Sequence, residues 1–269
     1  MTSLTDLQMT NISITSLEWL RTLIVRLPRL KSLTIASVLV KHEEDLLVSS
    51  DSISFDGPRI ERLHINYPRL TTNAQSFFRS ALLPQYRSIF LEPLQELHIQ
   101  MYYLDHTFVS LCRDLIQAAT MVKSLDIAGD CSNSLSPRPS IQPIILPINL
   151  QFFAVGLHFA SNHTHLSAMR WFADALFSGP CESVEQLHIM ISFDSVSLLL
   201  RDHETWTHLR QLDRRLSAAT TFHCLQITYR CHQGLTPEGK SRLLSCTLET
   251  FASLQEIGAL KIKLHGDSS

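Results

Sequence analysis

The sequence predicts an α/β fold, with a curved parallel sheet on the concave side and helices on the convex side. Three observations predict it. One six-residue pattern, apolar-x-x-apolar-x-apolar, occurs nine times in order, and the central apolar residues of successive copies are 26 to 38 residues apart. The last two apolar positions alternate with a polar or small residue, which is the period of a strand with one buried face. Segments with helical spacing lie between the copies.

Each copy of the pattern predicts a strand whose central residue points into the core. The alternation is clearest in Leu63-His64-Ile65, Leu97-His98-Ile99 and Leu187-His188-Ile189. A regular order with similar gaps makes the strands parallel neighbours in one sheet. The central residues are Leu7, Leu33, Leu63, Leu97, Leu125, Phe153, Leu187, Leu225 and Leu260.

The helical returns carry apolar residues at intervals of three and four. Ser16 is placed to cap the first of them, and Thr236-Pro237 offers a cap and a first-turn proline for the last. The expected helical segments are 17–27, 77–82, 108–119, 166–176, 206–216 and 237–251.

Two segments break the pattern. Residues 41–57 have no sustained period and predict an irregular loop. Residues 129–147 contain four prolines and several serines, which disfavour both helix and sheet, so they predict an exposed, proline-rich extended insertion. We otherwise expect residues 1–269 to form one domain of about nine irregular units.

Composition excludes several classes. Hydrophobic residues make up 45% of the 269 residues and charged residues 18%, which excludes an intrinsically disordered protein. A net charge of −2 argues against a nucleic-acid partner. With only 8 glycines and no glycine-rich phosphate loop, a nucleotide enzyme is not expected. No secretory signal or membrane-spanning apolar run is visible, and the six cysteines are scattered. These features favour a cytoplasmic or nuclear protein with free thiols.

A strand and a helical return repeated in this way resemble the unit of a leucine-rich-repeat solenoid. More narrowly, residues 4–12, 27–33 and 206–213 resemble the repeat region of fungal F-box-like proteins. This resemblance implies protein binding, as the substrate-recognition part of a ubiquitin-ligase adaptor. The chain departs from the family in two ways: the usual asparagine or cysteine ladder is missing, and no F-box precedes the first unit.

The histidines and cysteines do not predict a metal site or a cofactor. His203 and His208 are five residues apart and would point in different directions on a helix. His223-Cys224 and Cys231-His232 lack the spacing of a zinc site. The expected function is therefore non-enzymatic. The alternatives are a metal-dependent or histidine-based enzyme on a solenoid scaffold, or a truncated fragment of a longer repeat protein.

The residues that alternate with the buried positions are expected to line the concave face and to contact a protein partner. His64 and His98 fall on neighbouring strands there and could form a pH-sensitive patch. Phe152 and Met190 are its apolar members, although Phe152 could instead turn into the core at an irregular unit. The candidate binding residues are Arg62, His64, Asn66, Glu96, His98, Gln100, Asp126, Phe152, Gln186, His188, Met190 and Gln226.

Overall fold

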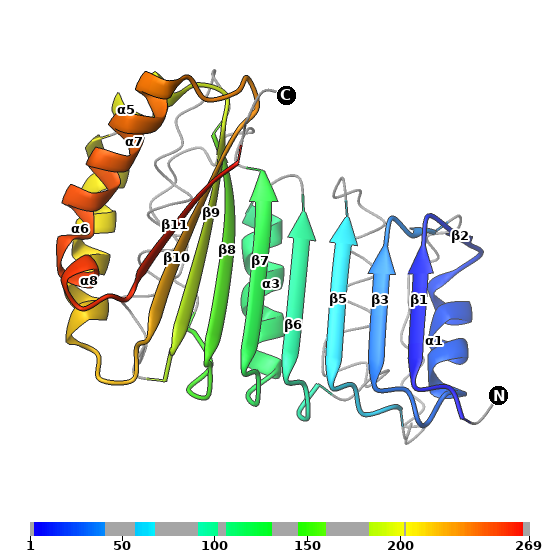
Figure 1. The fold of residues 1–269 in the computed structure, drawn as a ribbon. Coiled ribbons are helices and arrows are strands. Elements are labelled where there is room, and N and C mark those ends of the chain that lie inside the picture. Colours follow the sequence, from blue (N-terminus) through cyan, green and yellow to red (C-terminus); the bar gives the residue numbers. More distant parts are fainter. Residues whose placement is uncertain are drawn as a thin grey trace.

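The computed structural model describes residues 3–40, 57–67, 91–101, 106–130, 145–159, 183–201 and 203–265. Within these ranges nine strands form one parallel sheet, in the order in which they occur along the chain (Figure 1). The strands are β1 (Asp6–Thr10), β3 (Ser32–Ala36), β5 (Arg62–Tyr67), β6 (Glu96–Met101), β7 (Ser124–Asp130), β8 (Phe152–Phe159), β9 (Gln186–Phe193), β10 (Cys224–Cys231) and β11 (Leu260–His265).

The register of this sheet aligns the nine copies of the sequence pattern. Leu63 pairs with Leu33 on one side and with Leu97 on the other, and the same alignment continues to Leu225 and Leu260. The prediction of nine parallel neighbouring strands is therefore confirmed. Its cause is simple: in a parallel sheet with one buried face, a one-residue slip would expose every apolar side chain.

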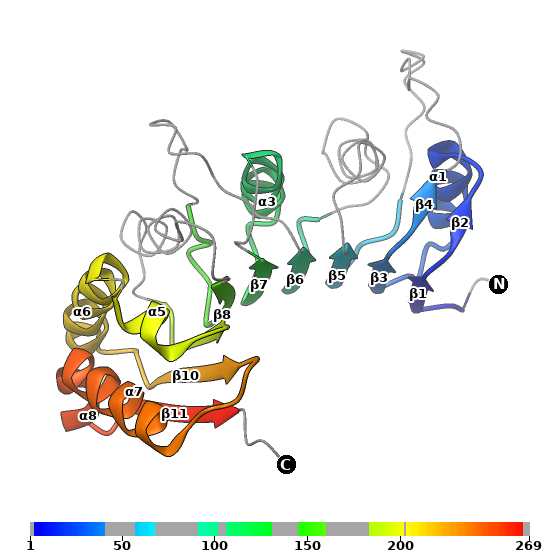
Figure 2. The same cartoon turned by 90° about the horizontal axis from the view of Figure 1, so that it is seen from above.

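The sheet is bent into an arc, and helices lie on the outer side of that arc (Figure 2). The described helices are α1 (Leu17–Val25), α3 (His106–Ala118), α5 (Val196–Arg201), α6 (His203–Ala218), α7 (Pro237–Thr250) and α8 (Ala252–Glu256). A two-stranded sheet of β2 (Ser13–Ile14) and β4 (Leu39–Val40) lies near α1 (Figure 2). We call the opposite, inner side of the nine-stranded sheet the concave face.

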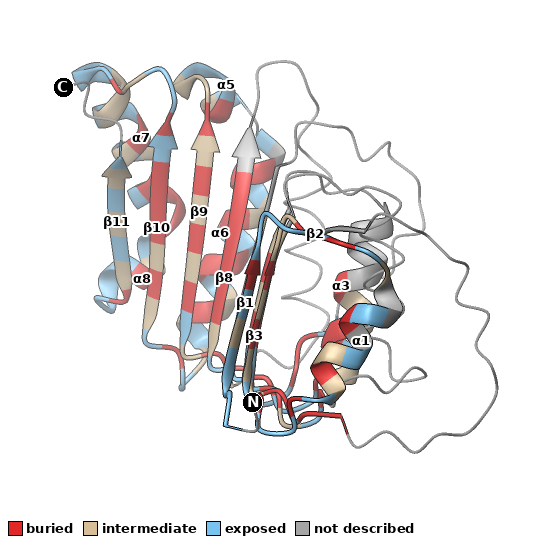
Figure 3. Cartoon of the chain, turned by 90° about the vertical axis from the view of Figure 1, so that its right-hand side faces the viewer, coloured by how far each residue is buried: buried red, intermediate tan, exposed pale blue. Residues whose placement is uncertain are grey.

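The core lies between the sheet and the helices. Figure 3 shows buried residues along β8, β9 and β10: they are consecutive over much of β8 and alternate with partly exposed residues in β9. The buried apolar side chains of the described units, from Met9 to Ala259, form one cluster. Leu7 and Leu260, on the two outermost strands, are only partly buried against it.

Side chains cap two helices as the sequence predicts. The Ser16 hydroxyl accepts a hydrogen bond from the Trp19 backbone N–H at 3.2 Å, and the Thr236 hydroxyl accepts one from Gly239 N–H at 3.1 Å. The helix expected over 237–251 is α7, which ends at Thr250, and the short helix α8 that follows it was not predicted. The expected helices at 77–82 and 166–176 lie outside the described residues, as does nearly all of the loop expected at 41–57.

The proline-rich insertion expected at 129–147 is wrong at both ends. Gly129 and Asp130 are the last residues of β7, because β8 is long enough to pair with both. At the other end Leu146 and Pro147 are buried, and the Pro147 carbonyl accepts a hydrogen bond from Leu150 N–H at 3.1 Å. Residues 131–144 lie outside the described residues.

Candidate functional site

The concave face is formed by the strand residues that alternate with the core residues. Because the sheet is parallel and in register, equivalent positions of neighbouring strands form continuous rows across it. The middle row contains Gln8, Thr34, His64, His98, Asp126, Ala154, His188, Gln226 and Lys261.

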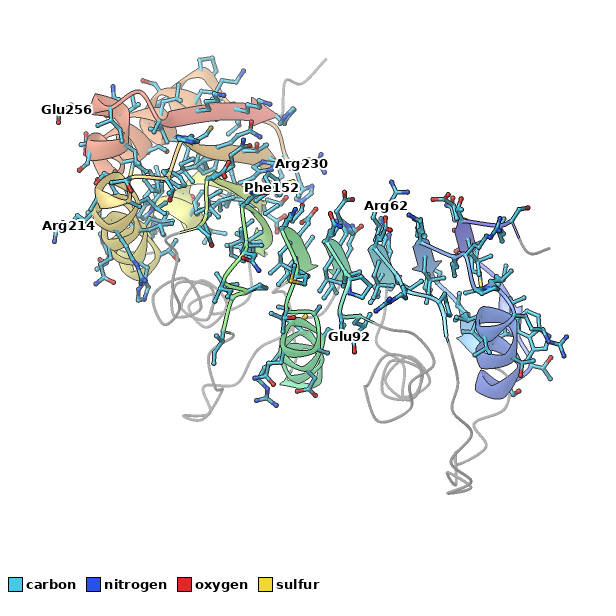
Figure 4. All side chains as sticks on the ribbon, turned by 90° about the horizontal axis from the view of Figure 1, so that it is seen from below. Arg62, Glu92, Phe152, Arg214, Arg230 and Glu256 are labelled. Atoms are coloured by element: carbon cyan, nitrogen blue, oxygen red, sulfur yellow. The ribbon has the colours of Figure 1, made fainter. Side chains whose placement is uncertain are left out.

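The structure places all twelve residues predicted from the sequence in these rows. Arg62, Glu96 and Gln186 are exposed, and the other nine are partly exposed. Phe152 lies on the concave face, since its neighbour Phe153 is the one that enters the core, at 1% exposure. Figure 4 shows Arg62, Phe152 and Arg230 on the concave side of the sheet, and Arg214 and Glu256 on the helices outside it.

Three residues of the middle row are linked across neighbouring strands. The imidazole rings of His64 and His98 lie 4.0 Å apart between centroids in an edge-to-face arrangement. His98 Nδ1 is 2.7 Å from Asp126 Oδ2, so the Nδ1–H donates to the carboxylate. Burial lowers the pKa of His64, the nearby charge of His98 lowers it further, and Asp126 opposes both effects. Within this group, a positive charge is therefore disfavoured on His64.

A second polar group surrounds His188 on β9. Its Nε2 lies 2.9 Å from the Thr228 hydroxyl and 3.1 Å from the Gln226 amide nitrogen. The amide nitrogen can only donate, so Nε2 accepts this bond and the ring is neutral. The pKa of His188 is lowered chiefly by burial; Asp126 raises it and Lys263 lowers it. Asp126 thus acts on the histidines of both groups.

Charged and amide side chains connect the strands at the N-terminal end of the face. Arg62 pairs with Asp6 at 3.1 Å, which spans from β5 to β1 above the short side chain of Ser32 on β3. Asn66 donates to the Gln100 side-chain oxygen at 3.2 Å. Both members of the ion pair are more than half exposed, so it orients the side chains more than it stabilises the fold.

Small residues floor the middle of the concave face. Ala128, Ala154 and Gly156 lie on the adjacent strands β7 and β8. A Cβ added at Gly156 would lie 3.1 Å from the Ala128 Cβ and 3.4 Å from the Met190 Cε. The end of the Met190 side chain therefore lies over Gly156, which leaves no room for a larger residue there.

Sequence reasoning missed several members of this face. Thr228 binds His188, Lys263 acts on its charge, and Ala154 separates His188 from Asp126. The sequence contains a signal for these three residues, because each occupies an outward position of the same period-two pattern. The ring contact and the hydrogen bonds depend on side-chain rotamers, on which the pattern carries no information.

No three His, Cys, Asp or Glu side chains of the described residues are grouped so that they could hold a metal ion. Cys224 and Cys231, the cysteines of the two His/Cys pairs, are the first and last residues of β10. An eight-residue strand separates them by roughly 23 Å, so the two pairs do not share one site.

Comparison with protein-family models finds none that matches the chain, and comparison with curated proteins finds no similar sequence. Across the described residues, the helices are too short or too polar to span a bilayer.

Proposed function

We propose that this chain is an irregular leucine-rich-repeat-type solenoid that works without catalysis, as a module that binds a protein partner on its concave face. The single observation that carries the proposal is the extent of that face. Nine parallel strands each present at least three outward positions in register. That number is comparable with the roughly 20–30 residues that each partner contributes to a standard protein–protein interface.

The composition of the face supports a protein partner. Phe152 and Met190 are partly accessible apolar residues in the middle of it, and Arg62 is an exposed cation on the N-terminal side. Aromatic, methionine and arginine side chains are enriched at protein interfaces, and aromatic and arginine side chains dominate binding energy there. Acidic residues such as Glu96 and Asp126 lie among the basic ones, which disfavours a polyanion such as nucleic acid.

We further propose that the module serves as the substrate-recognition part of an F-box-type ubiquitin-ligase adaptor. Support for this narrower role comes from the residues that resemble fungal F-box-like repeats, 27–33 and 206–213 among them. In such an adaptor the solenoid selects the protein to be modified and transfers no group itself. The cytoplasm or nucleus is the compartment in which such a module acts.

Site-specific photo-cross-linking tests the docking surface. A photoreactive amino acid replaces Phe152 or Gln186 on the concave face, and Arg214 or Glu256 on the outer helices serves as the matched control (Figure 4). We expect one protein to be captured from source cells by the two concave positions and by neither outer position.

Affinity measurements with the captured protein complete the test. Phe152→Ala combined with Met190→Ala should weaken binding about tenfold or more, the effect of losing a hot spot. Arg214→Ala, a change of an exposed residue outside the face, should leave affinity unchanged. If the concave variants fold and keep their affinity while Arg214→Ala or Glu256→Ala loses it, the proposal is wrong.

A further inference from the structure

The surroundings of His64 on the concave face, where its ring contacts the His98 ring edge to face, are compatible with a neutral His64 and not with a charged one. The His64 Nε2 is buried and has no hydrogen-bond partner among the described residues. The His98 ring lies 4.0 Å away between centroids, edge to face. An imidazolium is a donor at both nitrogens, so a charged His64 would bury an ionised N–H without an acceptor.

His98 has different surroundings. Its Nδ1 donates to Asp126 at 2.7 Å, and both side chains of this pair are about one-third exposed. His98 is therefore bonded to a carboxylate beside solvent. A proton added to His64 would lie beside the second ring, without a bonded carboxylate.

We propose that His64, His98 and Asp126 form a proton-operated switch on the concave face, in which protonation of His64 separates the two rings and turns a covered neutral ring into an exposed cation. Burial and the His98 charge lower the pKa of His64, in agreement with this geometry. On the β3 side the register partner of His64 is Thr34, whose short side chain presents little obstacle to this movement.

The surrounding charges leave this assignment intact. On its own strand, His64 is followed and preceded by outward Asn66 and Arg62, and Arg62 is already paired with Asp6. Strand β3 presents no charged residue to the ring. Among the charged or titratable side chains of the concave rows, Asp6 on β1, Arg62 on β5, Glu96 on β6 and Asp126 on β7 belong to the strands nearest the pair, whereas His188 on β9 and Lys263 on β11 lie farther along the sheet.

The switch gives the docking surface a dependence on pH, and this consequence rests on the proposed function. A partner whose neutral or apolar groups cover the two rings meets an uncharged His64 at neutral pH. In mild acid it must desolvate a cation, which is costly without a paired anion. Such a partner is released as the pH falls.

Histidine NMR of the free chain tests the switch itself. The chain is labelled with carbon-13 at its histidine rings, and His64→Gln assigns the His64 signal. We expect the His64 midpoint to lie below 6.5, the ordinary value. It should move up in His98→Gln, which removes a cation, and down in Asp126→Asn, which removes an anion. The nuclear Overhauser contact between the two rings should disappear as His64 titrates.

Lys263→Gln provides the matched control. It should raise the His188 midpoint, because Lys263 lowers the pKa of His188, and it should leave the His64 midpoint where it was. A His64 midpoint at or above 6.5, a midpoint that His98→Gln does not move, or a ring contact that survives protonation overturns the switch.

The partner captured by cross-linking tests the regulatory consequence. Its affinity for the wild-type chain should fall several-fold between about pH 7 and about pH 5.5, the range in which histidines titrate, and His64→Gln should remove this dependence. An affinity with the same pH dependence in wild type and His64→Gln overturns the regulation. Failure of any partner to bind the concave face overturns the proposed function instead, and the NMR result on the free chain stands apart from both.

Discussion

The two ends of the sheet are built differently. Near the N-terminus β1, β3, β5 and β6 have five or six residues, whereas β8, β9 and β10 have eight. The extra length adds a fourth inward position, occupied on β9 and β10 by Phe193 and Cys231, which are 0% and 6% exposed. Strands β8 to β10 therefore bury more apolar surface per unit than the shorter strands, and burial is the main stabilising contribution to the fold.

The helix layer differs in the same direction. At the C-terminal end buried polar bonds fix the helices: Tyr229 pairs with Thr247 at 2.9 Å, and the Trp206 indole donates to the Leu199 carbonyl at 3.0 Å. Near the N-terminus the described part of α1 contributes apolar residues such as Leu20 to the core, and its Trp19 is 48% exposed. The C-terminal end thus has a defined packing geometry as well as a larger core, and we expect it to unfold last.

The largest effect should come from truncating a central core residue in the shorter-stranded half. Leu97 is 1% exposed, so Leu97→Ala should cost about 2–5 kcal/mol, the usual cost of emptying a buried leucine site. Urea denaturation measures this. In hydrogen exchange, amides of β5 to β7 should lose protection while those of β10 keep theirs, because each strand of the sheet pairs only with its immediate neighbours. A cost under about 1 kcal/mol, or equal loss of protection at β10, would contradict the comparison.

The next effect concerns a cap that spans two helices. Asp213 of α6 is buried and accepts hydrogen bonds from the Ser253 and Leu254 N–H groups at 3.2 and 2.9 Å, at the start of α8. Asp213→Ala should destabilise the chain by about 1–2 kcal/mol, the range for a lost N-cap. Asp213→Asn keeps one acceptor and should cost less. Equal denaturation midpoints for wild type and Asp213→Ala would show that this bond does not hold the C-terminal end together.

These elements separate what the sequence could predict from what it could not. The strand order and register follow from a local pattern, and Ser16 and Thr236 mark helix starts with local hydrogen bonds. The short helix α8 was missed because its cap, Asp213, comes from about 40 residues earlier in the chain. The end of β7 at Asp130 was missed because the length of its neighbour β8 sets it.

The same distinction applies to the concave face, of which some features could be predicted from the sequence and others could not. Which residues lie on it could be predicted, since the period of two decides the face of a strand. What those residues do to one another could not. The His98–Asp126 and His188–Thr228 bonds depend on which rotamers fit beside the short side chain of Ala154, which lies between Asp126 and His188 in the row. Tertiary packing sets these choices, and neither residue type nor spacing reveals them.

A smaller effect on stability is expected from Gly156→Ala, in the middle of the concave face. Gly156→Ala would place its Cβ 3.1 Å from the Ala128 Cβ and 3.3 Å from the Ala128 Cα, which is backbone and cannot turn away. Overpacking of this kind typically costs 1–3 kcal/mol; we expect about 1 kcal/mol, because the third contact is the flexible end of Met190. Adding Ala128→Gly should recover part of the loss in urea denaturation. A Gly156→Ala variant as stable as wild type would show that the two strands separate freely here.

The smallest effect is a dependence of stability on pH that arises from both ends of the face at once. The pKa values of His64 and His188 are lowered in the fold, chiefly by burial. Above pH 6.5, the ordinary value, both rings are neutral whether the chain is folded or unfolded, and they add no slope. As the pH falls through 6.5 the unfolded chain binds protons first, so the free energy of unfolding decreases until the folded pKa values are reached.

Because both rings are partly exposed, solvent screens this contribution, and only a modest fall in the urea midpoint is expected between about pH 7.5 and pH 5. The His64→Gln, His188→Gln double variant is the control, since every other titrating group is common to the two chains. As the pH falls, the free energy of unfolding of the wild type should decrease relative to that of the double variant. His64→Gln and His188→Gln alone then apportion the slope between the shorter-stranded and the longer-stranded half of the sheet. If the difference in free energy of unfolding between the two chains stays constant with pH, or if the wild type becomes relatively more stable as the pH falls, neither ring is held neutral by the fold.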